Sequence, residues 1–217
     1  MSILKQSLNM TNNRAFKLGV LASGRGTNLQ AIIDSIERGN LAAEVALVVS
    51  DKKDAPALQR SRRHGIKSLF LDPKSYPDQN CYERALIDAL ERESAELVCL
   101  AGFMRILGKV FIQAFRGRIL NIHPSLLPAF PGLDAQKKAL EHGVKYAGCT
   151  VHFVDETVDG GPIVSQAAVP VYDSDDVETL SRRILEREHV IYSRAIQWFL
   201  ENRLVLAGRK VILKNKP

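Results

Sequence analysis

The segment "FKLGVLASGRGTNLQAIID" (16–34) decides the fold. Its first part, 16–23, is a mostly apolar run typical of a buried strand. Its last part places Leu29, Ile32 and Ile33 at the spacing of one helix face. The glycine-containing stretch "SGRGTNLQ" joins the two parts. A buried strand followed at once by an amphipathic helix is the first half of a βαβ unit, in which helices cover parallel strands.

The same alternation continues to the end of the chain. Further strands are predicted over 44–51, 66–72, 96–103, 118–123, 147–154 and 162–172, and further helices over 55–65, 81–94, 109–115, 135–143 and 176–202. No helix pattern separates the last two strands, so that pair can be antiparallel. Asp175 is the expected N-cap of the last helix, with Glu178 completing a capping box. The sequence therefore predicts an α/β fold: a single doubly wound, mostly parallel, Rossmann-like sheet with helices on both faces.

The composition is that of an ordinary globular domain. The chain has 217 residues, of which 46% are hydrophobic and 25% charged, and no apolar run approaches the length of a membrane span. Three widely spaced cysteines argue against disulfides and a zinc site. We expect a domain over 17–205, a flexible N-terminal extension over 1–16 and a basic C-terminal tail over 206–217. A cytoplasmic location is expected, because no signal peptide is apparent.

The net charge of +6 is concentrated at the two ends of the chain. Residues 1–17 carry +3 and residues 203–217 carry +5, which leaves −2 for the body of the protein. Solvated basic ends explain this distribution better than a nucleic-acid surface does. We therefore expect neither nucleic acid nor a membrane as a partner.

The loop after the first strand has the features of an anion site. Gly24 and Gly26 allow a tight turn, and the N–H groups of Gly26, Thr27 and Asn28 then lie at a helix N-terminus, which suits a phosphate. A nucleoside-triphosphate loop would require a lysine after the second glycine. A dinucleotide loop would require a third glycine, although Asp51 at the end of the second strand could bind a ribose. A monophosphate, or simply a glycine turn, fits the loop better.

Two polar side chains stand at the end of the strand predicted over 118–123. Asn121 and His123 project from the same face, and Pro124 ends the strand directly after them. An amide and an imidazole can both donate to an oxyanion. The loop after the strand 147–154 offers Asp155, Glu156 and Asp159, and a carboxylate near His123 would raise the pKa of the imidazole. Without a serine or cysteine nucleophile, an amide, an imidazole and a carboxylate predict acyl transfer to a nucleophile that the substrate supplies, such as an amine, unless they merely end a strand and a turn.

Four motifs carry a resemblance to a known family. "SGRGTNLQAIID" (23–34), "LAGFMRIL" (100–107), "NIHPSLLPAFPG" (121–132) and "VHFVDETVDGGPI" (151–163) are similar, in this order, to phosphoribosylglycinamide formyltransferases. The resemblance covers about residues 17–205. It implies transfer of the formyl group of 10-formyltetrahydrofolate, a co-substrate, to the amine of 5-phosphoribosylglycinamide in de novo purine (IMP) biosynthesis.

The resemblance also implies roles for individual residues. Asn121, His123 and Asp159 match the catalytic residues of the family, the first two as oxyanion donors. The other implied site residues are Gly26, Thr27 and Asn28 for the substrate phosphate, Glu188 for the glycinamide end, and Met104, Arg105, Ile106, Leu107, Asp155, Glu156, Thr157 and Val158 for the folate. No metal is implied, the expected partners are these small molecules, and a monomer and a homodimer both remain open.

Four positions depart from the family pattern. Gln79 stands where some members have an arginine near the folate, Asp134 and Gln136 stand where others carry histidines, and Arg187 precedes Glu188 where other side chains occur. Four alternatives remain. They are a nicotinamide dehydrogenase, an RNA-binding module, a formyltetrahydrofolate deformylase and a methionyl-tRNA formyltransferase. The last two normally carry a further N-terminal or C-terminal domain, and we expect neither here.

Overall fold

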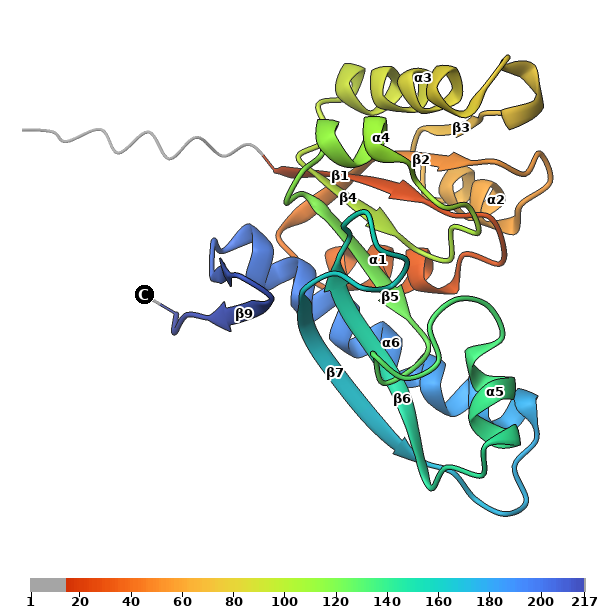
Figure 1. The fold of residues 1–217 in the computed structure, drawn as a ribbon. Coiled ribbons are helices and arrows are strands. Elements are labelled where there is room, and N and C mark those ends of the chain that lie inside the picture. The colour runs from red at the N-terminus through yellow and green to blue at the C-terminus, as the bar shows by residue number, and fades with distance from the viewer. Residues whose placement is uncertain (1–14, 217) are drawn as a thin grey trace, which may run out of the picture.

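The computed structural model describes residues 15–216 (Figure 1), so the predicted N-terminal extension lies outside the described residues up to residue 14. The strands are β1 (Phe16–Leu21), β2 (Ala43–Ser50), β3 (Ser68–Phe70), β4 (Leu97–Leu100), β5 (Ile119–His123), β6 (Tyr146–Phe153), β7 (Ile163–Pro170), β8 (Leu204–Ala207) and β9 (Lys210–Leu213). The helices are α1 (Thr27–Glu37), α2 (Pro56–Arg63), the 3₁₀ turn η1 (Pro73–Ser75), α3 (Gln79–Arg92), α4 (Lys109–Ala114), α5 (Ala135–Glu141) and α6 (Val177–Leu200). No helix among the described residues has both the length and the apolar character to cross a membrane.

The strands form one sheet in the order β3-β2-β1-β4-β5-β6-β7-β9-β8. Strands β1 to β5 run parallel, and β6 is antiparallel to both of its neighbours, β5 and β7. The predicted doubly wound, mostly parallel sheet is therefore confirmed, as is the antiparallel pair near its end. The strand order reverses between β1 and β4, and ligands of such sheets bind at the carboxyl ends of the strands beside this reversal.

Helices cover both faces of the sheet, with α3 and α4 on one face and α1 and α6 on the other (Figure 1). Alternate residues of the strands supply the two cores. In β4, Leu97 and Cys99 pack with α1 and α6, whereas Val98 and Leu100 pack with α3 and α4. This burial on both faces explains why the central strands read as continuous apolar runs.

The beginning of α6 corrects one prediction. The N-cap is Asp176 and not Asp175: its carboxylate accepts from the Thr179 N–H at 2.8 Å, and the Thr179 hydroxyl accepts from the Asp176 N–H at 2.9 Å. Asp175 instead accepts two 2.7 Å hydrogen bonds from Arg183, and Glu178 pairs with Arg182. A threonine at the third helical position takes the reciprocal role expected of the glutamate.

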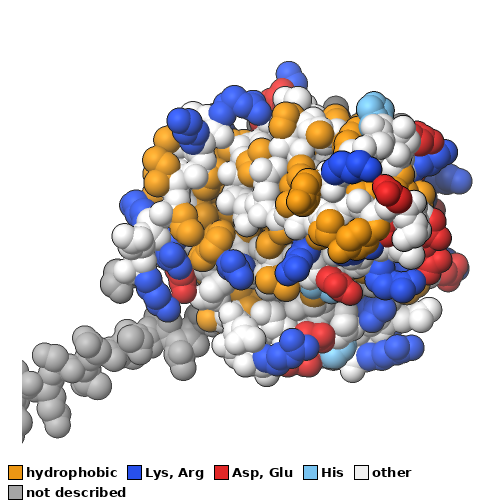
Figure 2. All heavy atoms as spheres, turned by 90° about the horizontal axis from the view of Figure 1, so that it is seen from below, with side chains coloured by type: hydrophobic (Ala, Val, Ile, Leu, Met, Phe, Trp, Pro, Cys, Tyr) orange, Lys and Arg blue, Asp and Glu red, His pale blue; other side chains and the backbone are white. Residues whose placement is uncertain are grey.

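The C-terminal segment is also more ordered than a solvated tail. β8 and β9 form a hairpin, and β9 pairs with β7 at Lys210 and Ile163. The sheet thus continues past α6, and part of the basic C-terminal segment becomes a structural edge. On the face shown in Figure 2, basic side chains are mixed with acidic and apolar ones.

Candidate active site

The predicted pair on β5 meets a third side chain from β6. Asn121 and His152 lie opposite each other in the antiparallel register. His152 Nδ1 is 2.8 Å from the Phe153 carbonyl oxygen, so this nitrogen carries the proton, and Nε2 is left to accept from Asn121 Nδ2 at 3.1 Å. This contact fixes the orientation of the Asn121 amide, because its Nδ2 faces only acceptors.

Asp159 joins the cluster from the loop between β6 and β7. Its Oδ1 accepts from Asn121 Nδ2 at 3.3 Å, and its Oδ2 lies 3.3 Å from His123 Nδ1 and accepts from the Gly132 N–H at 2.8 Å. Burial alone would raise the pKa of Asp159, but the contacts with His152, Gly132 and His123 outweigh it and lower this pKa. The structure therefore brings Asn121, His123 and Asp159 together around an ionised carboxylate.

His123 is buried, and both of its ring nitrogens face acceptors. Nδ1 faces Asp159, and Nε2 lies 3.0 Å from the Phe130 carbonyl oxygen. These two partners favour the imidazolium, as expected for Asp159. Burial acts in the opposite direction and is the larger effect, so the pKa of His123 lies below its ordinary value. Asp159 thus raises the pKa of His123 as expected. The expectation that this pKa lies above its ordinary value is wrong, because burial lowers it by more.

The loop after β1 has the form predicted for an anion site. Gly26 is the N-cap of α1 in the left-handed region, with φ 70°, and α1 has neither a side-chain cap nor an acidic residue in its first turn. A Cβ on Gly26 would lie 2.8 Å from Ala57. The free N–H groups at this end of α1 can therefore donate hydrogen bonds to an anion, and a side chain on Gly26 would disturb them.

The Asn28 side chain turns inward from this loop. Its Nδ2 donates to Glu188 Oε2 at 2.7 Å, and both side chains are buried. Burial raises the pKa of Glu188, against the hydrogen bond from Asn28, which lowers it. The predicted phosphate loop and the predicted glycinamide residue are thus in direct contact.

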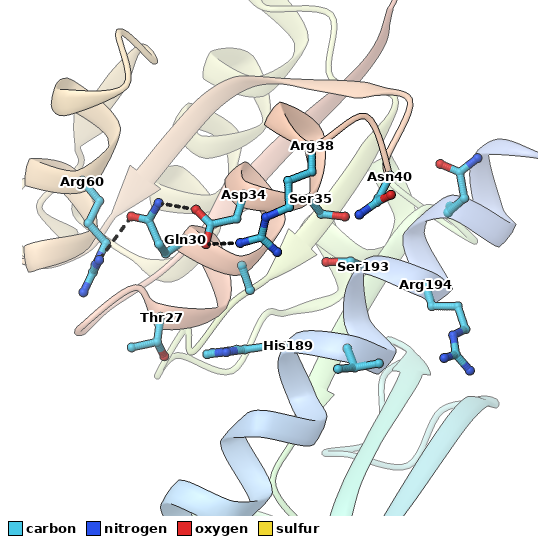
Figure 3. A pocket seen from close by; sticks show the side chains of 13 residues that line it. Thr27, Gln30, Asp34, Ser35, Arg38, Asn40, Arg60, His189, Ser193 and Arg194 are labelled. Carbon is cyan, nitrogen blue, oxygen red and sulfur yellow. Dashed lines mark hydrogen bonds and ion pairs between the residues drawn. The ribbon is translucent and has the colours of Figure 1, made fainter.

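Thr27 borders a groove of about 650 Å³ between α1 and α6, shown in Figure 3. His189, which follows Glu188, reaches toward Thr27 in this view. Burial lowers the pKa of His189, and its buried Nε2 has no hydrogen-bond partner among the described residues. The groove therefore adjoins the N-terminal end of α1 and does not include Asn121, His123 or Asp159.

The segments predicted to bind folate expose apolar side chains. Met104 is 61% exposed and Ile106 71%, between β4 and α4, and Val158 is 50% exposed in the loop after β6. Arg105 lies over the Tyr82 ring, and Leu107 is buried in the core under α3 and α4. Exposed apolar side chains that lie near one another are typical of a ligand site, whereas Leu107 packs in the core.

A buried carboxylate on α3, which no motif in the sequence indicates, anchors the 104–108 segment. Glu83 is 1% exposed and accepts from the N–H groups of Gly108 at 2.5 Å and Phe111 at 3.2 Å. Gln79 donates to Glu83 at 2.8 Å and to the Ile106 carbonyl at 3.2 Å. Gln79 thus makes internal hydrogen bonds to this segment.

The remaining predicted residues lie in two places. In the loop after β6, Asp155 accepts from the Thr157 N–H at 2.8 Å, and Glu156 lies 3.3 Å from Lys109 of α4. Asp134, with φ 58°, is the residue directly before α5, and Gln136 lies in α5. Among the described residues, no group of three or more His, Cys, Asp or Glu side chains has the arrangement of a metal site.

The fold and the site together define a doubly wound α/β protein with an amide, an imidazole and a carboxylate at the carboxyl edge of its sheet. The description "Formyl transferase" belongs to the family model that matches residues 16–196. The chain is 45% identical to the phosphoribosylglycinamide formyltransferase of Bacillus subtilis, over 85% of this chain and 94% of that protein. The chain therefore belongs to the formyl transferase family, and the resemblance seen in its motifs is confirmed.

Other relatives agree with this family. The crystal structure of glycinamide ribonucleotide transformylase 1 from Symbiobacterium toebii superposes with a TM-score of 0.91 and 55% identity, covering 93% of this chain and 95% of that one. The chain is also 46% identical, over 89% of its length, to the trifunctional purine biosynthetic protein adenosine-3 of Drosophila pseudoobscura pseudoobscura. It spans only 14% of that protein.

Proposed function

We propose that this chain transfers the formyl group of 10-formyltetrahydrofolate to the amine of 5-phosphoribosylglycinamide in purine biosynthesis. The contact between His123 and Asp159, beside Asn121, is the observation that carries the proposal. Support also comes from the relatives of matching length, which are phosphoribosylglycinamide formyltransferases.

The substrates would bind at two sides of this cluster. The N–H groups of Gly26, Thr27 and Asn28 at the start of α1 bind the phosphate, and Glu188 binds the glycinamide end. The folate lies against the apolar side chains of Met104, Ile106 and Val158 and against the loop formed by 155–158. This arrangement directs the amine and the formyl group toward Asn121 and His123.

The reaction is direct attack of the amine on the formyl carbon. The new C–N bond forms as the carbonyl electrons move to oxygen, and the resulting oxyanion accepts hydrogen bonds from Asn121 and His123. The N–H groups of both residues already have protein acceptors, so the oxyanion replaces the Phe130 carbonyl at His123 Nε2 and competes with Asp159 at Asn121 Nδ2.

Proton transfer follows from the charge of the cluster. The pKa of His123 lies below its ordinary value before the reaction, so the ring is largely neutral at pH 7. The oxyanion adds a second negative charge beside Asp159 and favours the imidazolium. The amine nitrogen of the intermediate loses a proton to His123, and the imidazolium so formed gives a proton to the folate nitrogen. The oxyanion re-forms the carbonyl bond, and tetrahydrofolate leaves as the bond from its nitrogen to the formyl carbon breaks.

A turnover assay tests the proposal. The protein is mixed with 5-phosphoribosylglycinamide and 10-formyltetrahydrofolate, and release of tetrahydrofolate is followed together with formation of the formylated amide. We expect stoichiometric release that depends on the amine. Release without the amine would indicate a deformylase, and the absence of any release would refute the proposal.

A further inference from the structure

The C-terminal hairpin contacts the loop that carries Asp159. Arg209, at the turn between β8 and β9, donates from Nη2 to the Gly160 carbonyl oxygen at 2.7 Å. The next residue, Lys210, pairs with Ile163, which is the first residue of β7 after this loop. Two adjacent hairpin residues therefore meet the loop and the strand that follows it.

The contact lies directly beside Asp159. Gly160 donates its N–H to the Thr157 carbonyl at 3.1 Å, so with Arg209 both backbone polar groups of Gly160 have partners. Asp159 itself has φ 50°, a left-handed conformation that a residue with a side chain keeps only where its surroundings hold it. Fixing Gly160 thus helps to fix the backbone from which the Asp159 carboxylate projects.

The closing end of this loop lies close against the end of β6, because a Cβ on Gly161 would overlap the Phe153 carbonyl oxygen. The Phe153 N–H also donates to the Pro162 carbonyl at 2.9 Å. In the stretch 155–160 between these points, the Asp159 side chain is held by Asn121, His123 and the Gly132 N–H, and two further contacts reach the stretch from its outer side. Lys109 of α4 reaches it at Glu156, and Arg209 reaches it at Gly160.

We propose that Arg209 is a positioning residue that holds the loop 154–162, and with it Asp159, in the arrangement that contacts His123. The hairpin is then part of the site's support. The kinetic consequence rests on the proposed function of Asp159, whereas the effect on the loop does not. The phosphate loop and α6 residue Glu188 are not contacted by Arg209, so the affinity for the phosphorylated substrate stays unchanged.

Three variants separate this role from general stability. Arg209→Ala removes the hydrogen bond, Arg209→Lys keeps a charged donor, and Lys214→Ala is the matched control, since it removes an exposed basic side chain from the same hairpin region. Amide hydrogen exchange of 154–162 is measured by mass spectrometry on the full chain, beside kcat and KM for each substrate and the pH dependence of kcat.

We expect Arg209→Ala to speed exchange in the loop about fivefold, the effect of losing one exposed charge-assisted hydrogen bond. It should lower kcat by a similar factor and shift the pH dependence of kcat, with KM for the phosphorylated amine unchanged. Arg209→Lys should restore part of both effects, and Lys214→Ala should match the wild type.

Unchanged exchange in the Arg209→Ala protein would overturn the proposal, as would faster exchange with unchanged kcat in an active enzyme. If the wild type itself shows no turnover, the proposed function fails, and the exchange rates still decide whether Arg209 holds the loop.

Discussion

The Asn28 amide donates a 2.7 Å hydrogen bond to the Glu188 carboxylate, although 160 residues separate the two in the chain. This buried contact joins the N-terminal end of α1 to the middle of α6. It also leaves Asn28 Oδ1 buried without a partner among the described residues. Because burial raises the pKa of Glu188, keeping this carboxylate ionised costs the fold free energy.

Glu188→Gln should therefore stabilise the protein at neutral pH while it weakens substrate binding. The pKa of Glu188 in the folded state lies above its ordinary value of about 4.5. Between these two pKa values, the folded state therefore binds more protons than the unfolded state. The wild type thus loses stability from about pH 4.5 upward to its folded-state pKa, and the Gln variant does not.

Urea unfolding at pH 4 and pH 7 measures this difference, with Glu186→Gln, an exposed change on the same helix, as control. KM for the phosphorylated amine should rise about tenfold in Glu188→Gln, if one charged hydrogen bond to the substrate is lost. A Gln variant that is less stable than the wild type at pH 7 would contradict the assigned cost of burial.

The sequence predicts the architecture well because strands that are buried on both faces of the sheet consist of continuous apolar runs. β1 and β5 are such runs, and the polar tip at Asn121 and His123 stands out against them. The partner of Asn121 could not be predicted in the same way. His152 lies opposite it only because of the register between β5 and β6, which the sequence does not reveal.

Other parts of the site depend on contacts that are remote in sequence. Glu83 reads as one more charged residue of an amphipathic helix, and only the packing of α3 against α4 shows that it is buried. The hairpin of β8 and β9 has short strands and many basic residues, so its composition favours a solvated tail. Its pairing with β7 overrides that preference.

Asp159→Asn should lower the pKa of His123 further. The carboxylate raises this pKa against the larger effect of burial, so a neutral amide removes one of the two groups that favour the imidazolium. The titration of the His123 ring, followed by NMR, should move to lower pH, and turnover should fall by about a hundredfold or more. In the titration of His123, Asp155→Asn, in the same loop, controls for the loss of a charge. An unshifted His123 titration would show that Asp159 does not act on the imidazole.

Gly26→Ala should damage the phosphate loop through two separate effects. The new Cβ meets Ala57 at 2.8 Å, and φ 70° is unfavourable for alanine. Gly143→Ala shares the second effect alone, since its φ is 67° and nothing lies within 4 Å of its Cβ. We expect a loss of about 1 kcal/mol in the free energy of unfolding for Gly143→Ala and a larger loss for Gly26→Ala. Equal losses, measured by urea unfolding, would mean that the contact with Ala57 relaxes without cost.

Glu83→Ala should destabilise the protein and weaken folate binding together. The change leaves the N–H groups of Gly108 and Phe111 without their buried acceptor, which costs about 3 kcal/mol, and it frees the 104–108 segment that Gln79 also holds. Glu83→Gln keeps one acceptor oxygen and should lose about half as much. Urea unfolding and a fluorescence titration with a folate measure the two effects, with the exposed Glu91→Ala on the same helix as control. If a folded Glu83→Ala protein bound the folate as tightly as the wild type does, the role of Glu83 would be limited to capping α4.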